Sequence, residues 1–192
     1  MEKEQLFEFF RKKRFFPIGN DINYRMADQL QETILLMLSD NPKLPIHILL
    51  NSIGGQVGAA LTIYDFLMSI PSPSIGYVNG KCHSAALVVL AGCKNRLSTP
   101  NSRFLCHSIT SSIEIKNVLQ TEEDIKSYFN ETKRMSEAVA LIQKNSFGIQ
   151  KEDFLKLSEK GERTRIPLFA DEAKQYGIIH KIVKKIPIDF SL

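Results

Sequence analysis

The sequence predicts a single α/β domain built from parallel strands with helical crossovers. Short apolar runs at 46–50 and 75–78 are typical of buried strands, and an amphipathic helical pattern at 24–39 precedes them. Strands that alternate with helices usually form a parallel sheet, because each helix returns the chain to the edge where the next strand begins. With 192 residues, 43% of them hydrophobic, the chain can bury one substantial core.

The first quarter of the chain divides into helix, strand and helix. Residues 4–13 place leucine and phenylalanine at helical spacing, which predicts a short helix with one apolar stripe. We expect a strand at 14–18 and a turn at 19–22. The segment 24–39 then carries apolar residues three and four positions apart and predicts an amphipathic helix.

The next segment combines a strand with a glycine pair. We expect a strand that ends at Leu50, a loop containing Gly54-Gly55, and a second amphipathic helix. His47 lies inside the strand, and nothing around it suggests a set of metal ligands, so we interpret it as structural. Paired glycines let the backbone approach a ligand and leave N–H groups unshielded, as an oxyanion site requires.

The stretch from 75 to 107 carries the candidate chemistry. An apolar strand at 75–78 leads to Asn79-Gly80, where we expect a turn with positive φ. Ser84 then precedes an uncharged run that predicts a buried helix, whose first N–H groups and dipole would act on the serine. His107 follows a strand at 104–106. The simpler interpretation is that Ser84 is only an N-cap and His107 only a structural histidine.

Composition excludes several classes of protein. The net charge of +4 is mild, and basic residues are interspersed with acidic ones outside the cluster 11–14, so we expect neither nucleic-acid nor membrane binding. We see no apolar run long enough for a membrane span and no signal-peptide pattern. Cys82, Cys93 and Cys106 lack metal-ligand spacing and indicate free buried thiols, which fits the cytoplasm. No metal or organic cofactor is implied.

Four motifs in the same order resemble the proteolytic subunit of the Clp protease, ClpP. NSIGGQVGAALTIYDFL at 51–67 resembles the family pattern N-S-P-G-G-x-V-x-A-G-x-x-I-Y-D. The segment GKCHSAA resembles the nucleophile turn G-x-x-x-S, TPNSRFLCH resembles L-P-N-S-R-x-x-x-H, and DEAKQYGIIHKIV resembles E-E-A-x-x-Y-G-L-I-D-x-V. The match runs from about Arg14 to Val183.

The resemblance implies a fold and a division of the chain. The fold is the ClpP/crotonase-like α/β fold of repeated ββα units with a protruding handle helix. We expect one domain over 1–192, with an N-terminal helix at 1–13, a head core at 14–107, a handle at 108–163 and a C-terminal head segment at 164–192. In this family the handle interlocks two rings. Residues 121–145 fit that helix, because Thr121 is a suitable N-cap before three acidic residues and the list Ile125, Phe129, Met135, Val139 and Ile142 forms an apolar stripe.

The resemblance also implies an activity. Ser84 would attack a peptide carbonyl, His107 would accept and return its proton, and the N–H groups of Gly55 and Ala85 would hold the oxyanion. Expected substrates are peptides or unfolded proteins that enter a ring oligomer. An AAA+ unfoldase is the usual family partner, but this chain begins almost at the first helix, so the axial loops that would couple it to an unfoldase are not matched.

Two positions depart from the family pattern. The family's triad aspartate corresponds to Thr164 in GERTRIPLF, and the acids Asp153, Glu159, Glu162 and Asp171 remain as alternatives. Losing the triad acid can cost about 10⁴-fold in rate. His83 replaces the usual alanine before the nucleophile and resembles the translocation-enhancing branch of ClpP-like proteins; a role for His83 as the base is a minor alternative.

Three functions therefore stay open at this point. The first is a serine peptidase with a substituted orienting residue. The second is a weak or inactive ClpP-like assembly subunit, which Thr164 favours. The third, less favoured, is a crotonase-like acyl-CoA enzyme, whose oxyanion hole is also built from glycine-rich turns but which normally lacks a serine paired with a histidine.

We expect the segment 108–118 to form an exposed strand or loop.

Overall fold

The computed structural model describes residues 3–107, 109, 121–150, 152–153, 156–159 and 166–186. The elements in chain order are α1 Lys3–Lys12, β1 Phe15–Ile22, α2 Tyr24–Asp40, β2 Ile46–Gly55, α3 Val57–Ser69, β3 Ser74–His83, α4 Ala85–Ala91, β4 Asn95–Ser98, β5 Arg103–Leu105, α5 Glu122–Phe147, β6 Leu168–Phe169, α7 Ala170–Gln175 and β7 Lys181–Ile182. The predicted α/β class is confirmed, and the expected strand or loop at 108–118 lies outside the described residues, except for 109.

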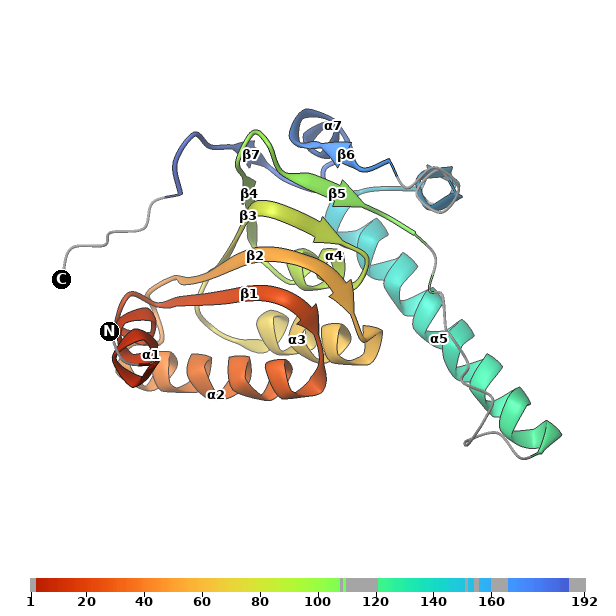
Figure 1. Cartoon of the computed structure of the whole chain (residues 1–192), viewed down its shortest axis with the longest axis horizontal. Helices are drawn as coiled ribbons and strands as arrows, with labels where there is room; N and C mark the ends of the chain where they lie inside the picture. The colour runs from red at the N-terminus through yellow and green to blue at the C-terminus, as the bar shows by residue number, and fades with distance from the viewer. Residues whose placement is uncertain are drawn as a thin grey trace.

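Among the described residues, seven strands form one sheet. Five of them follow the order β1-β2-β3-β4-β7, and these neighbours are all parallel. The long strand β3 changes partner along its length. Its residues 75–78 pair with β4, whereas residues 81–83 pair with β5, which in turn pairs antiparallel with β6. Figure 1 shows β1, β2, β3 and β5 running in the same direction, with their ends toward α5. The carboxyl ends of the strands therefore meet near that helix.

The strands β1 and β2 extend further than the sequence predicts. We expected a turn at 19–22 and a strand end at Leu50, but β1 continues to Ile22 and β2 to Gly55. Both expectations are wrong because the two strands pair with each other to their ends, Ile22 beside Gly55, with an irregular register between Gly19 and Asp21. Pairing between distant segments supplies the hydrogen bonds that make an otherwise turn-like sequence extended.

The core is formed by one face of the sheet with α2, α3 and α4. All seven residues of α4 are buried, which confirms the prediction for the run after Ser84. Such an apolar helix is stable only when it is surrounded, and α4 contacts β2, β3, α3 and α5. The largest fully buried side chains come from every layer: Phe104, Ile18, Ile22, Leu30, Ile34, Met37, Ile46, Ile48, Leu50, Ile63, Leu87 and Leu90.

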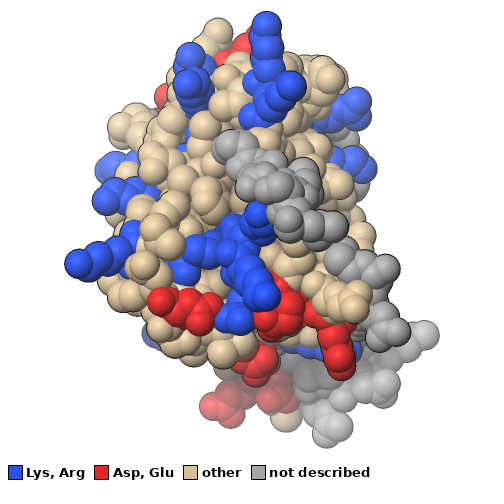
Figure 2. Space-filling model, turned by 90° about the vertical axis from the view of Figure 1, so that its left-hand side faces the viewer, with Lys and Arg blue, Asp and Glu red and all other residues tan. Residues whose placement is uncertain are grey.

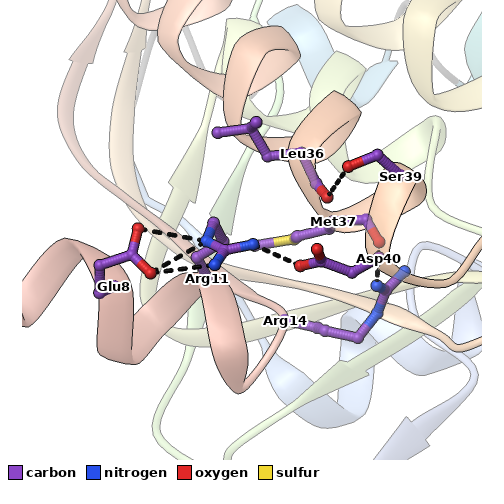
Figure 3. A network of polar contacts seen from close by, with 7 residues as sticks. All are labelled: Glu8, Arg11, Arg14, Leu36, Met37, Ser39 and Asp40. Atoms are coloured by element: carbon purple, nitrogen blue, oxygen red, sulfur yellow. Dashed lines mark hydrogen bonds and ion pairs between the residues drawn. The ribbon is translucent and has the colours of Figure 1, made fainter.

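Two arginines fasten α1 and the start of β1 to the end of α2 (Figure 3). Arg11 donates to Glu8 within α1 and forms an ion pair with Asp40 at the end of α2. Arg14, with φ +58°, is buried and donates to the backbone carbonyl of Met37 and to two carbonyls of the following loop. The Met37 carbonyl also accepts from the Asn41 N–H that caps α2, so Arg14 is a second donor to this carbonyl and joins the helix end to the loop that follows it.

Helix α5 begins with a capping box and buries only its last part. The Thr121 hydroxyl accepts from the Asp124 N–H at 3.1 Å, and the Asp124 carboxylate accepts from the Thr121 N–H at 3.0 Å, so the predicted N-cap is confirmed. The predicted apolar stripe is buried at Val139 but exposed at Ile125 (44%) and Phe129 (64%). Figure 1 shows the reason: the first turns of α5 project away from the sheet.

Arg96 joins the end of α5 to the segment that follows α7. Its guanidinium donates to the carbonyls of Ile178 (2.9 Å), Ser146 (2.7 Å) and Gly177 (3.1 Å), and it lies 5.1 Å from the ring centroid of Phe147. Burial lowers the pKa of Arg96. Its charge is compensated by carbonyl dipoles from two segments, the end of α5 and residues 177–178, which fixes their positions relative to β4.

Charges are mixed on the side of the molecule that carries α1. Figure 2 shows acidic side chains directly beside basic ones in its lower half, in agreement with the even charge distribution expected from the sequence. Within the described ranges, no helix is both long enough and apolar enough to cross a membrane.

Candidate active site

Ser84 occupies a strained turn between β3 and α4. Its backbone has φ +54° and ψ −124°, a conformation that non-glycine residues rarely adopt. The predicted turn at Asn79-Gly80 is wrong: both residues lie inside β3, and the left-handed conformation falls on Ser84 instead. The Ser84 side chain makes no N-cap hydrogen bond, so it does not act as the simple helix cap that was the alternative. A serine on a sharp strand-to-helix turn is typical of a nucleophile.

The pairing of β3 with β5 brings His107 to Ser84. Lys81 lies beside Arg103 and His83 beside Leu105, and the Ser84 N–H donates to the Leu105 carbonyl at 2.8 Å. His107 follows two residues later. Ser84 and His107 both line one small cavity of about 20 Å³, which is enough for a single water molecule.

The cavity wall is otherwise largely apolar. It is completed by Val57, Ala85, Leu87, Val88, Cys106, Val139 and Gln143. Val139 and Gln143 come from the buried end of α5, so the projecting helix contributes directly to this site. Sequence reasoning missed this contribution. The sequence carries only a weak signal for it, Gln143 directly after the apolar position Ile142; that Gln143 is 3% exposed and close to the Cys106 thiol is visible only in the structure.

The glycine pair packs against the serine turn from β2. Gly54 has φ +105°, and a Cβ atom there would lie 2.8 Å from the His83 carbonyl oxygen and 3.1 Å from the Ala85 nitrogen. Gly55 has φ +145° and faces Ile22, where a Cβ atom would lie 2.2 Å from the carbonyl oxygen. Gly54 therefore has to lack a side chain because of the serine turn, and Gly55 because of β1.

Ser52 holds the glycine pair at the end of β2 in place. Its hydroxyl accepts from the Gly54 N–H at 3.1 Å and donates to the Asn20 carbonyl oxygen. The Ala85 N–H belongs to the first turn of α4, where N–H groups have no partner within the helix. Ala85 lines the cavity, whereas Gly55 is not among its lining residues within the described chain, so the role of Gly55 stays a prediction.

Burial near the serine turn keeps two thiols and one histidine in their neutral forms. Burial raises the pKa of Cys106 to about 12 and the pKa of Cys82 well above its ordinary value. Both thiols, which are free as predicted, stay protonated at neutral pH and are poor nucleophiles. His83 is half-buried, and its Nε2 atom is enclosed without a hydrogen-bond partner among the described residues. Burial, followed by Lys81, His107 and Arg103, lowers the pKa of His83.

Three of the candidates for the third triad position, Asp153, Glu159 and Asp171, lie in the described residues. Thr164 and Glu162 lie outside the described residues. Asp171 is an unsuitable partner, because β5 and β6 are antiparallel and the chain moves away from the His107 end of β5 once it passes Leu168. Asp153 is exposed and lies 3.5 Å from the Lys156 ammonium. Glu159 is exposed at the end of the interrupted segment before β6.

The described residues offer no group of three or more histidine, cysteine or acidic side chains arranged to bind a metal ion. His47, interpreted from the sequence as structural, stacks on Phe15 with 4.6 Å between ring centroids and also on Tyr77 at 5.7 Å.

Comparison with known proteins places the chain in a family. The sequence model of the family described as Clp protease matches residues 1–186. A Clp protease proteolytic subunit 2 from Chlamydia pneumoniae is 32% identical over 174 residues, which cover 90% of this chain and 81% of that protein. A proteolytic subunit 3 from a Synechococcus strain is 28% identical over 173 residues, which cover 89% and 82%.

A solved structure agrees with this match. A point mutant of ClpP1 from Listeria monocytogenes superposes with a TM-score of 0.78 at 26% sequence identity, over 94% of this chain and 96% of that one. The ClpP, crotonase-like fold expected from the motifs is therefore confirmed. The chain belongs to the Clp protease family of proteolytic subunits.

Proposed function

We propose that the chain is a serine endopeptidase that uses Ser84 and His107. The observation that carries the proposal is the position of Ser84 on a strained turn, with His107 lining the same cavity. Ser84 Oγ attacks the peptide carbonyl, and His107 accepts the proton and delivers it to the leaving amine. The N–H groups of Gly55 and Ala85 stabilise the oxyanion, assisted by the start of α4.

Thr164 lowers the expected rate. A triad acid holds the histidine in the correct tautomer and stabilises its protonated form, and its loss costs about 10⁴-fold. A hydroxyl can accept a hydrogen bond but supplies no negative charge. We therefore expect slow turnover at Ser84. If the rate is negligible, the chain is the inactive assembly subunit that Thr164 also favours.

Labelling with a fluorophosphonate probe tests the proposal. The wild-type protein should gain one adduct by intact mass, and Ser84→Ala should gain none. Ser69→Ala, which removes an exposed hydroxyl at the far end of α3, is the matched control and should label like the wild type. Thr164→Asp should accelerate labelling. If neither the folded wild-type protein nor the folded Thr164→Asp variant gained an adduct, Ser84 would be ruled out as a nucleophile.

The proposal extends to assembly. Family membership supports a ring of identical subunits in the cytoplasm that encloses the sites and admits peptides or unfolded proteins, and an AAA+ unfoldase remains an open partner. Large apolar side chains on α1, α2 and α3 are available for subunit contacts, including Phe7 (43% exposed), Leu35 (56%) and Met68 (61%). Native mass spectrometry measures the number of subunits.

A further inference from the structure

The strands β3 and β5 place two basic residues side by side. Lys81 lies directly beside Arg103 in the parallel register, and both side chains are exposed. The next pair, Cys82 and Phe104, is fully buried in the core. Side chains alternate along a strand, so Lys81 and Arg103 both point away from the core on the same face. Like charges that lie directly opposite each other on paired strands repel.

Two histidines extend this pair toward the nucleophile. His83 lies on the same face as Lys81, two residues further along β3. His107 follows the end of β5 by two residues and is close enough to His83 to act on its charge. We call Lys81, His83, Arg103 and His107 the basic strip. The charged groups that influence His83 are the other three members, all of them basic. In the part of the chain that the structure describes, neither Lys81 nor Arg103 forms an ion pair.

The basic strip ends at the bond-breaking site. Lys81 precedes Ser84 by three residues, and a strand rises about 3.3 Å per residue, so the paired charges begin about 10 Å from the serine. An extended peptide that lies along the strip advances at the same rate. Its side chains about two to four positions from the scissile bond would therefore reach Lys81 and Arg103.

We propose that Lys81 and Arg103 form a carboxylate-binding subsite that selects peptides with an acidic group about two to four residues from the bond that Ser84 attacks. The proposal rests on the function proposed above. Arginine offers a planar pair of donors to a carboxylate, and lysine adds a compact positive charge. The carboxylate has two sources, an aspartate or glutamate side chain and the free C-terminus of the peptide.

A second copy of this chain is the competing occupant, because an acidic surface of a neighbouring subunit could also neutralise the strip. The continuity of the strip with Ser84 and His107 favours the substrate. The two occupants predict different outcomes: a substrate subsite alters selectivity, whereas a subunit contact alters the oligomeric state.

The test compares matched peptides. All peptides share one cleavable bond. For each of several positions around that bond, one peptide carries Glu and its partner carries Gln. In a further pair, one peptide ends in a free carboxylic acid and the other in an amide. Cleavage is followed by mass spectrometry for the wild type, for Lys81→Gln with Arg103→Gln, and for the charge reversal Lys81→Glu with Arg103→Glu. Lys94→Gln is the control, because Lys94 lies at the opposite end of β3, beside Ser74.

We expect the wild type to prefer the acidic peptide about threefold to tenfold in kcat/KM, the combined effect of two exposed charge pairs. The preference should fall as salt is added, because salt screens exposed charges. The neutral double variant should lose it, the charge reversal should favour a Lys-containing peptide, and Lys94→Gln should retain the wild-type preference. A preference for the free acid over the amide would identify the C-terminus as the carboxylate source.

Binding separates this proposal from the catalytic one. Fluorescence anisotropy of the Glu and Gln peptides with Ser84→Ala measures the subsite even if no peptide is cleaved. Equal affinity for the two peptides, or a preference that survives the double substitution, would overturn the subsite. An unchanged selectivity together with an altered subunit number by native mass spectrometry would assign the strip to a subunit contact instead.

Discussion

Replacing Gly54 with alanine tests the packing of the end of β2 against the serine turn. The residue has φ +105°, and its new Cβ atom would lie 2.8 Å from both the His83 carbonyl oxygen and Ser84 Cβ. Backbone strain costs about 1–3 kcal/mol, and forcing an extra methyl group into packed surroundings costs about 1–3 kcal/mol more. Gly54→Ala should therefore lower the free energy of unfolding by about 2–6 kcal/mol.

Gly148→Ala is the matched control for this substitution. Gly148 ends α5 with φ +75°, and nothing lies within 4 Å of the position that its Cβ atom would occupy. This control carries the strain without the collision and should cost about 1–2 kcal/mol. Urea unfolding at equilibrium measures both changes.

The same pair separates stability from reactivity. A side chain at Gly54 would press on the Ala85 nitrogen, and loss of one oxyanion donor costs about 10²–10³-fold in rate. Gly54→Ala should slow fluorophosphonate labelling by about that factor under conditions where the variant is folded, and Gly148→Ala should not. Labelling of Gly54→Ala at the wild-type rate would refute the assignment of an oxyanion donor at this turn.

Three further substitutions probe the supports of the site. Arg96→Met leaves buried carbonyls unpaired and should destabilise the protein to urea by about 3 kcal/mol or more; a loss below about 1 kcal/mol would contradict the bridging role. Thr121→Ala removes the N-cap of α5 and should lower the stability of the helix by about 1 kcal/mol. Amide hydrogen exchange in the first turn of α5 should then become faster, and an unchanged rate there would contradict the capping role. Burial and Arg14 lower the pKa of His47 in the folded protein, so the unfolded chain binds a proton at His47 more readily than the folded protein does. The stability that neutral His47 provides is therefore lost as the pH falls below about 6.5. His47→Phe should keep the ring stack and reduce the loss of stability between about pH 7.5 and pH 5; equal losses in both proteins would refute this.

The sequence identified the elements whose signals are local. The apolar run after Ser84, the N-cap at Thr121 and the amphipathic pattern of α2 all depend on neighbours within a few residues, and the structure confirms them. Strand ends depend instead on distant partners. The extension of β1 to Ile22 results from pairing with Gly55, which no local pattern contains.

The candidate site shows the same division. Motif order predicts roles for Ser84, His107 and the glycine pair, but it does not indicate that Gly54 rather than Gly55 packs against the serine turn. It also missed the juxtaposition of Lys81 with Arg103, because these residues are 22 positions apart and meet only through the strand register. Charge relationships of this kind require the topology of the sheet.

The projection of α5 has a consequence for amide hydrogen exchange. In the part of the chain that the structure describes, Ile125 and Phe129 lie exposed on the helix, whereas Val139 and Phe147 are buried in the core. Amides in the outer turns should therefore exchange through local fraying, and amides in the inner turns only through larger opening events. Any contact that covers the outer turns will slow their exchange. The protection gradient along this one helix thus reports subunit association without a label.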